Sequence, residues 1–394
     1  MIGLPIASVK WSDQLLIGVS FRTRPECILA MGFQNTGIFR PFTSDTSDHE
    51  VEVGGVRVSA KTIVVATGSR AAVPPIEGLT ELAFLTNRDV FSPDALPRSL
   101  AILGAGPIGV ELGQAFGRLG SEVTIIDMAE RILPRDDEEM ASVVARRLER
   151  KGVHTVLDAR VERITHLNGK KVIEFASQEG AAQRHPSVSA DEILGAAGRV
   201  ANTGELNLGA AGIEAGRGGY IAVDKTLRTR VRRVALHAGG SIDYRTVPWV
   251  TYTDPELASV GHTEETASRD GLKFCVVRQS FSVLDRAHAE DATDGLMKVV
   301  LGKGARVIGV QIAASGAGEL IGPALHAFTH RWKFAALRSV ITPYSTMGEV
   351  YSRAVSTQLA PKLFNPRARG ILRFLFRYRG TGPTTETTVG KREE

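Results

Sequence analysis

The stretch "ILGAGPIGVELG" holds the strongest chemical signal in the sequence. Gly104, Gly106 and Gly109 form a G-x-G-x-x-G pattern, and an acid, Asp127, follows eighteen residues after Gly109. In such a loop the first glycine permits a tight turn and the second lets the backbone approach a pyrophosphate at a helix N-terminus. An acid at the end of the next strand accepts hydrogen bonds from a ribose 2′-OH and repels a 2′-phosphate. The pattern predicts a dinucleotide site that favours NAD, and the nearby Arg131 leaves NADP open.

Strands and helices alternate around these glycines. A strand is expected at Leu100–Leu103, followed by a helix that stops at Gly120; its apolar residues at helical spacing are Ile108, Leu112, Ala115, Phe116 and Leu119. "EVTIID" is the next strand, and a second helix follows with Asp136 and Asp137 in its first turn, where acids suit the helix dipole. "KVIEFA" and "EILGAAG" supply further strands, so we expect a parallel, doubly wound α/β sheet.

The regions before and after this alternating segment have other sequence patterns. The first thirty-odd residues show no clear period, "EVEVGGVRV" alternates like a hairpin, and "KTIVVATGS" is a buried strand that ends at Ala66-Thr67-Gly68. After Pro248, a strand pair formed by "LMKVVL" and "ARVIGVQIA" and a helix beginning near Gly318-Glu319 indicate a separate α+β module.

Composition restricts the class of protein. With 394 residues, 43% of them hydrophobic, the chain is long enough for two or three domains. No apolar run reaches the ~18 residues of a membrane span, and Lys10 and Asp13 interrupt the stretch where a signal peptide would be apolar. Cys27 and Cys275 form neither a C-x-x-C nor a C-x-x-x-x-C pair. We therefore expect a cytoplasmic location.

The net charge is concentrated at the C-terminal end. Residues 361–394 carry eight basic and three acidic side chains, a net of +5, which equals the net charge of the whole chain. Phe374, Leu375 and Phe376 lie among these arginines, so the segment could dock on a membrane surface or an acidic partner. We favour instead a terminal helix packed on its own protein with a disordered end from Thr381, and expect neither membrane contact nor nucleic-acid binding.

Several stretches, taken in order, resemble one family. They are "KTIVVATGSRAAVPPIEG", "GAGPIGVELGQAFGRLGSEVTIID", "DEILGAAGRVANTGELNLGAAGIE", "VPWVTYTDPELASVGHTEETA", "DRA" at Asp285, "AGELI" at Ala317 and "ITPYSTMGEV". They are similar to class I pyridine nucleotide-disulfide oxidoreductases, namely dihydrolipoamide dehydrogenases and, with the tail "PKLFNPRARGILRFL", mercuric-reductase-like flavoproteins. The resemblance covers about residues 45 to 380 and implies an FAD domain, an NAD(P) domain and a homodimer formed by the C-terminal domain.

The resemblance also implies site residues. Ala66, Thr67 and Gly68 would lie against FAD, and Glu111 would face the nicotinamide and the flavin edge as a catalytic residue. The residues implied around NAD are Gly104, Ala105, Gly106, Pro107, Ile108, Gly109, Asp127, Val161 and Gly198.

The sequence departs from the family pattern in three places. The 44 residues before the resemblance do not contain the family's N-terminal glycine fingerprint or its C-x-x-x-x-C pair. If the nucleotide sequence upstream of Met1 encoded both, a full enzyme would be restored. Ser241 stands where an aspartate would hold the flavin, and the following loop and helix are shortened. In "ITPYSTMGEV", Glu349 keeps its place, whereas Tyr344 and Thr342 stand where histidines are expected. Tyrosine titrates at about 10 and histidine at about 6.5, so Tyr344 either binds metal or substrate, as in the mercuric-reductase branch, or fills the dimer interface.

Two further residues, His326 and His330, form H-x-x-x-H on an expected helix. The segment lacks the glutamate of a zinc-protease motif and a third ligand, so we expect no metal there.

Two functions follow from the sequence. The first is an FAD-dependent NAD(P)H oxidoreductase that passes hydride from nicotinamide to flavin, and the second is a catalytically inactive, NAD-binding, dimerising remnant. In both, we divide the chain into a truncated FAD domain (1–97), a Rossmann-type NAD(P) domain (98–198), a shortened returning FAD segment (199–246), an α+β dimerisation domain (247–360) and the basic tail (361–394).

Overall fold

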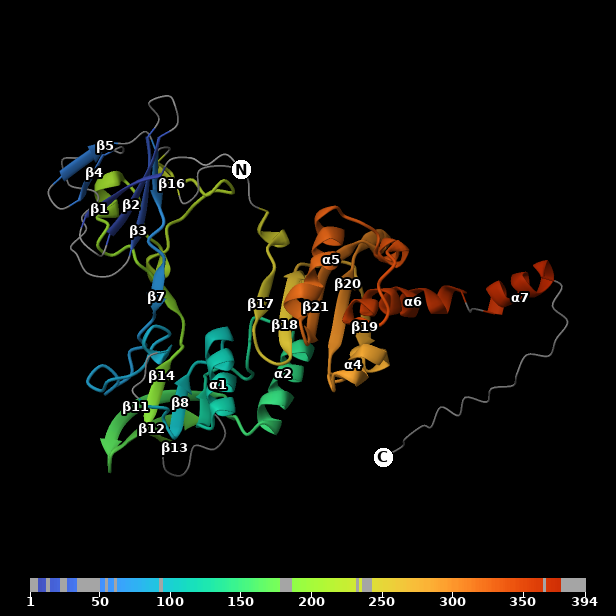
Figure 1. The fold of residues 1–394 in the computed structure, drawn as a ribbon, viewed down its shortest axis with the longest axis horizontal. Coiled ribbons are helices and arrows are strands. Elements are labelled where there is room, and N and C mark those ends of the chain that lie inside the picture. The colour runs from blue at the N-terminus through green and yellow to red at the C-terminus, as the bar shows by residue number, and fades with distance from the viewer. Residues whose placement is uncertain are drawn as a thin grey trace.

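The strands and helices form three groups in the computed structural model (Figure 1), and Val234–Ala235, which follow the middle group in sequence, return to the sheet of the first. The structure describes residues 6–11, 15–21, 27–33, 50–53, 56–59, 62–91, 95–177, 186–231, 234–235, 243–363 and 366–376.

The middle group is the doubly wound sheet predicted from the sequence. Its strands are β8 (Ser99–Leu103), β9 (Glu122–Ile126), β10 (His154–Val156) and β14 (Glu192–Gly195), in the order β10-β9-β8-β14 and all parallel. The two helices are α1 (Pro107–Leu119) and α2 (Glu138–Arg150). Every residue of β8 is buried, as expected for a strand covered on both faces. The mixed α/β fold, with a Rossmann-type unit at its centre, is therefore confirmed.

One strand was predicted in this sheet but belongs to another. "KVIEFA" lies in β12 (Lys170–Ser177), which pairs antiparallel with β11 (Ala159–Leu167) and β13 (Ser187–Ala190) in a separate sheet. Asn168 and Gly169, with φ of 52° and 77°, connect β11 to β12. Asn-Gly in this conformation forms the tight turn of a hairpin, and that local turn determines the antiparallel pairing.

The expected apolar face of α1 also needs correction. Ala115 and Leu119 are exposed, whereas Gly109, Val110, Gly113, Gln114 and Phe116 are buried. A Cβ on Gly113 would lie 3.0 Å from Ile125 Cδ1, so this glycine lets the helix approach β9 closely. Close backbone approach, rather than apolar spacing, thus selects the buried face, while Gly120 ends the helix at φ 105° as predicted.

The second helix begins slightly later than expected. Asp137 is its N-cap and accepts a hydrogen bond from Met140 N, whereas Glu138 and Glu139 occupy the first turn. Asp136 precedes the helix, and its Oδ1 accepts a hydrogen bond from Trp249 Nε1 at 2.7 Å. Burial raises the pKa of Asp136 although this hydrogen bond acts in the opposite direction.

The first group contains a sheet in the order β1-β2-β3-β6-β16. Its strands are β1 (Ile6–Trp11), β2 (Leu15–Phe21), β3 (Cys27–Phe33), β6 (Thr62–Val65) and β16 (Val234–Ala235). The predicted hairpin is present as β4 (Glu50–Val53) and β5 (Val56–Ser59), and β7 (Ser69–Ala71) pairs with β15 (Arg199–Ala201). β3 pairs in parallel directly with β6.

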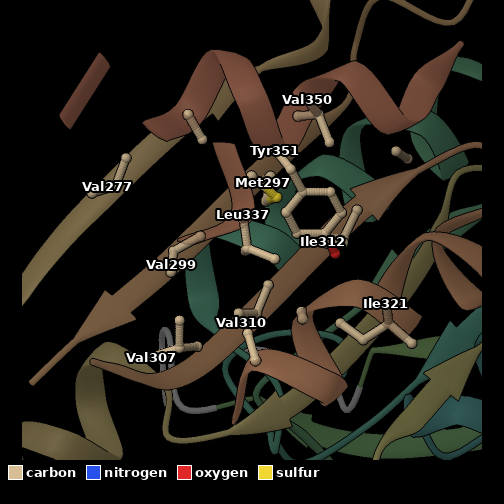
Figure 2. Packing of buried hydrophobic residues seen from close by; sticks show 14 of the residues in the cluster. Val277, Met297, Val299, Val307, Val310, Ile312, Ile321, Leu337, Val350 and Tyr351 are labelled. Carbon is tan, nitrogen blue, oxygen red and sulfur yellow. The ribbon is translucent and has the colours of Figure 1, made fainter. Parts of the chain in front are cut away.

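The last group is an antiparallel sheet in the order β17-β18-β21-β20-β19. Its strands are β17 (Trp249–Thr251), β18 (Glu256–Gly261), β19 (Cys275–Ser280), β20 (Leu296–Leu301) and β21 (Val307–Ala314). Its helices are α3 (Glu264–Arg269), α4 (Asp285–Ala289), α5 (Ala317–Thr329) and α6 (Val350–Leu363). Figure 2 shows their common core, in which Met297, Val310, Ile321 and Tyr351 gather between strands and helices.

The final helix, α7 (Pro366–Leu375), does not pack as the sequence suggested. Ile371, Phe374, Leu375 and Phe376 are 60% to 83% exposed, and Figure 1 shows α7 beyond α6, away from the sheets. Packing on its own protein is therefore not found in the single chain, while the expectation for residues 381–394 lies outside the described residues. Among the helices that the structure describes, none is long and apolar enough to cross a bilayer.

Candidate functional site

The glycine-rich loop joins β8 to α1 and has the geometry of a phosphate cradle. Gly104 has φ 121°, and a Cβ there would lie 2.5 Å from Ala196 O. A Cβ on Gly109 would lie 1.9 Å from Gly104 O, so both positions require glycine for the turn itself. A Cβ on Gly106 would meet nothing within 4 Å, because this residue faces open space.

The N-terminus of α1 is open toward that space. Gly106 is the N-cap and supplies no side-chain hydrogen bond, and Pro107 occupies the first turn of the helix. The N–H groups of a first helical turn have no intrahelical acceptor, so they are available to an anion such as a pyrophosphate. The residues present therefore fit the phosphates of a dinucleotide.

Asp127 follows β9 directly and is fixed by two backbone groups. Its Oδ2 accepts a hydrogen bond from Ala105 N at 2.5 Å, and its Oδ1 accepts one from Ala129 N at 2.9 Å. The carboxylate is half-buried beside the glycine loop, where a ribose hydroxyl could donate to the remaining lone pairs. Asp127 thus connects the loop that receives the phosphates with the position expected for the ribose.

The other residues expected at the NAD site lie around the same loop. Val161 on β11 has a half-buried side chain. It lies two residues after Ala159, whose N–H donates to Asp127 O at 2.9 Å. Gly198, with φ 126°, belongs to the segment after β14 whose Ala196 abuts Gly104. Ile108 is half-buried in the first turn of α1. The fold therefore brings these residues to one edge of the parallel sheet.

Glu111 on α1 contacts the dimerisation module. Its Oε1 accepts a hydrogen bond from Tyr252 N at 2.8 Å. One turn later, Gln114 exchanges two hydrogen bonds with the backbone of Asp254, at 3.0 and 2.7 Å. Arg118 forms an ion pair with the carboxylate of Asp254. The helix that begins at the phosphate cradle is thus held along its length by the loop between β17 and β18.

A buried ionic cluster makes a second connection between the same two parts. Lys298 on β20 is 3% exposed, and its Nζ lies 2.9, 3.0 and 2.9 Å from carboxylate oxygens of Asp137, Glu139 and Glu264. Arg278 lies beside it on β19 and pairs with Glu139 and Glu264, each at 2.8 Å. Burial would lower the pKa of Lys298, but its hydrogen bonds to the three carboxylates outweigh this and raise it.

The residues expected against FAD form a turn after β6. Thr67 is buried, and the carbonyl oxygens of Thr67 and Gly68 accept hydrogen bonds from Asn202 Nδ2 and Asn202 N, both at 3.0 Å. Ala66 is exposed. Ser241, the remaining residue expected at FAD, lies outside the described residues.

The strand order of the first sheet does not fit a cradle for the FAD phosphates. In the NAD half, β8 and β9 lie between β10 and β14 and carry the glycine loop and Asp127. In the first sheet, β3 precedes the β4–β5 hairpin and pairs directly with β6, which follows it. Within the part of the chain that the structure describes, no strand–loop–helix unit lies between them. The described part of the first sheet therefore offers the FAD phosphates no cradle of the kind that β8 and α1 form.

Tyr344 and Glu349 lie in the segment between α5 and α6. The Tyr344 hydroxyl donates to Asp285 Oδ2 at 2.9 Å, and its side chain is 76% exposed. This hydrogen bond, with the nearby negative charge of Asp285 and Glu349, raises the pKa of Tyr344 above its usual value. Tyr344 is therefore protonated at neutral pH and can donate a hydrogen bond but not act as a base.

Replacing Asp285 by asparagine should lower the pKa of Tyr344 toward the usual value of about 10. Absorbance titration of tyrosinate at alkaline pH measures this, with Tyr344→Phe identifying the contribution of Tyr344 and Tyr244→Phe, an exposed tyrosine elsewhere, as control. An unchanged titration curve in Asp285→Asn would contradict the hydrogen bond.

His326 and His330 lie at the end of α5. Their rings are stacked with centroids 6.1 Å apart, and His330 Nδ1 is 2.9 Å from His326 O. Among the described residues, no group of three or more His, Cys, Asp or Glu side chains is arranged to hold a metal ion.

Sequence reasoning missed the residues that join the parts of the chain. Asn202, Tyr252, Asp254 and Lys298 each contact a residue far away in the sequence. Lys298 carried a usable signal, because it is a charged residue inside the apolar strand "LMKVVL". The backbone contacts of Tyr252 and Asp254 carried none.

Together, the parallel sheet, the glycine loop and the added α+β module define a Rossmann-type dinucleotide-binding fold joined to a separate α+β module. Residues 26–262 match the pyridine nucleotide-disulphide oxidoreductase family, and residues 247–355 match the dimerisation domain of the same family. The chain therefore belongs to the pyridine nucleotide-disulphide oxidoreductases. The match begins at residue 26, so the likeness extends further toward the N-terminus than the expected start near residue 45.

Similar proteins include oxidoreductases of three kinds. The chain is 32% identical over 349 residues to a mercuric reductase of Bacillus cereus, covering 79% of this chain and 53% of that protein. It is 32% identical over 339 residues to the mitochondrial dihydrolipoyl dehydrogenase 2 of Arabidopsis thaliana, covering 79% of this chain and 66% of that protein. The structure of the HOCl-induced flavoprotein disulfide reductase RclA from Escherichia coli aligns with a TM-score of 0.70 and 28% identity, covering 79% of this chain and 77% of that one. The chain spans about half to two thirds of the length of the curated relatives it matches. Family membership implies FAD and NAD(P) as cofactors and a dimer.

Proposed function

We propose that this chain is an FAD-dependent NAD(P)H oxidoreductase of the mercuric reductase and dihydrolipoamide dehydrogenase type, with NADH as the hydride donor. The observation that carries the proposal is the pairing of the Gly104–Gly109 cradle with Asp127 through Ala105 N. Phosphates would bind the N-terminus of α1 at Gly106, and the adenine ribose would donate to Asp127.

The proposal gives each of the expected site residues a role. Gly104 and Gly109 form the turn, Gly106 leaves room for the pyrophosphate, and Val161 and Gly198 border the nucleotide. Glu111 is proposed to face the nicotinamide while its carboxylate is positioned by Tyr252 N. Tyr344 and Glu349 are proposed to act toward the acceptor, with Tyr344 as a hydrogen-bond donor because its pKa is raised.

The same proposal assigns the larger parts of the chain. Residues 98–198 would bind the nicotinamide dinucleotide, residues 1–97 and 199–246 would form the flavin side, and residues 247–360 would form a homodimer. We also propose a cytoplasmic location, supported by the presence of only two cysteines, of which Cys275 is free and exposed.

The visible spectrum of the purified chain tests this function. Under the proposal the protein is yellow, or becomes so on reconstitution with FAD, and its flavin absorbance bleaches when NADH is added. The direct β3–β6 pairing favours a second candidate, an inactive NAD-binding and dimerising protein. Protein that stays colourless after reconstitution yet still binds NADH would overturn the first candidate and support the second.

Replacing Asp127 by asparagine should weaken NADH binding and reduce the preference over NADPH. A hydrogen bond to a charged group contributes about 1.5–3 kcal/mol, so we expect about a 10- to 100-fold rise in the Kd for NADH. Titration of cofactor fluorescence measures both constants. Glu130→Gln, which removes an exposed charge three residues away, is the matched control. Equal NADH and NADPH affinities before and after the change would show that the assignment of Asp127 is wrong.

A further inference from the structure

The C-terminal helix α7 and the residue after it expose apolar side chains that no other described part of the chain covers. Ile371, Phe374, Leu375 and Phe376 are 60%, 83%, 65% and 77% exposed. In the preceding helix α6, by contrast, the side chains at its start are buried in the core of the last sheet (Figure 2). α6 therefore anchors the segment, and α7 extends from it into solvent (Figure 1).

The same segment carries only positive charge. Between Glu349 and Glu386 the sequence contains no acidic residue and seven basic ones, namely Arg353, Lys362, Arg367, Arg369, Arg373, Arg377 and Arg379. The first 360 residues are neutral overall, because the net charge of +5 resides in residues 361–394. The segment is therefore complementary to an anionic surface, whereas the body of the protein is not.

Arg373 lies on a different face of α7 from the apolar pair Ile371 and Leu375. Ile371 and Leu375 are four residues apart and share one face of the helix, while Arg373, two residues from each, lies on the opposite side. A helix with basic residues on one side and Leu, Ile and Phe on the other lies well in the interface of a bilayer. The apolar side chains then enter the acyl boundary and the arginines contact the lipid phosphates.

We propose that α7 docks this protein peripherally on an anionic lipid bilayer. A second copy would offer α7 either another basic segment or a body that is neutral overall, and neither provides the negative charge that the arginines lack. A nucleic acid would satisfy the arginines but leave Phe374 and Leu375 exposed to water. A bilayer with anionic head groups accommodates both features, and the docking is independent of NADH binding at the glycine loop.

Flotation of the full chain with vesicles tests the proposal. One set of vesicles contains phosphatidylcholine alone, and the other contains phosphatidylcholine with phosphatidylserine. We expect at least about a tenfold higher bound fraction on the phosphatidylserine vesicles, and loss of that binding at high salt, because the attraction is screened.

Two double variants separate the apolar and the charged contributions. Phe374→Ala with Leu375→Ala, and Arg369→Gln with Arg373→Gln, should each lower binding to phosphatidylserine vesicles about tenfold. Phe91→Ala and Arg217→Gln replace exposed residues of the same types outside the tail and should bind as the unchanged protein does. Unchanged NADH affinity in all variants shows that each is folded.

Four results would overturn the proposal. The first is equal flotation of the unchanged protein with both kinds of vesicle, or with neither. The second is vesicle binding that persists in the Phe374→Ala, Leu375→Ala variant. The third is a change of oligomeric state in that variant by size-exclusion chromatography, which would assign the apolar face to a second copy. Binding to polyglutamate or duplex DNA without vesicle binding would likewise identify an acidic polymer as the partner.

Discussion

Replacing Gly106 by alanine should abolish most NADH binding while leaving the fold intact. The added Cβ meets no atom within 4 Å, and φ of −75° suits any residue, so the chain itself tolerates the change. The methyl group would instead occupy the space in which the pyrophosphate approaches the backbone. Loss of one or two hydrogen bonds to phosphate, about 1.5–3 kcal/mol each, predicts about a 10- to 100-fold or larger rise in Kd.

Calorimetric titration with NADH and thermal unfolding together measure this effect. Gly209→Ala is the matched control, because a Cβ at Gly209 also meets nothing within 4 Å and the residue lies in a short 3-10 helix away from the loop. Gly109→Ala should behave differently and lose both binding and stability, since its Cβ would lie 1.9 Å from Gly104 O. If Gly106→Ala and Gly209→Ala bound NADH with equal affinity, the phosphates would not bind at this loop.

Replacing Lys298 by methionine should destabilise the protein strongly. Methionine fills a similar volume but leaves the buried carboxylate of Asp137 with no cation, and deprives Glu139 and Glu264 of one of their two. Removing one partner of a buried ion pair costs about 3–5 kcal/mol, which corresponds to a fall of roughly 10 °C in the unfolding temperature.

A second replacement distinguishes an unpaired charge from poor packing. If the unpaired Asp137 causes the loss, then Lys298→Met combined with Asp137→Leu should recover part of the stability. The exposed Lys303→Met serves as control and should change the unfolding temperature by no more than about a degree or two. A Lys298→Met protein as stable as Lys303→Met would show that the cluster does not hold the two parts of the chain together.

The ionic cluster also predicts how stability depends on pH. The hydrogen bond to Lys298 lowers the pKa of Glu264 below 4.5, and the hydrogen bonds to Arg278 and Lys298 outweigh burial and lower that of Glu139 below the same value. Because both pKa values are lower in the folded state, the stabilisation is complete above pH 4.5 and disappears as the pH falls through the folded values. The difference in unfolding temperature between the unchanged protein and Lys298→Met should therefore shrink as the pH falls below that range. A difference that is constant with pH would contradict the assignment.

The parts of the fold that sequence predicted well are those specified by neighbouring residues. The strand β8, the helix α1 with its stop at Gly120, and the β20–β21 pair follow from apolar runs and from glycines at fixed offsets. The cradle of Gly104, Gly106 and Gly109 was predictable for the same reason, because its turn and its helix N-terminus lie within six residues. Asp127 required one further step, the parallel pairing of β8 with β9.

The errors arose where a local pattern had more than one solution. The apolar residues of α1 indicated a helix but not which of its faces would meet β9, and the glycines decided that. The "KVIEFA" strand was recognised but placed in the wrong sheet, since the Asn168-Gly169 turn was not taken into account.

The sequence by itself determined the family of this protein and the glycine loop proposed to receive a dinucleotide, because a phosphate cradle is made by a short, contiguous stretch of backbone. Only the tertiary structure decided that Lys298 closes an ionic cluster with Asp137, a residue 161 positions away, and that β3 lies directly against β6. It also decided that no other described segment covers Ile371, Phe374 and Leu375 of α7. Such pairings depend on which surfaces meet once the chain has collapsed, and the free energy of those contacts is not encoded in the spacing of residues along any single segment.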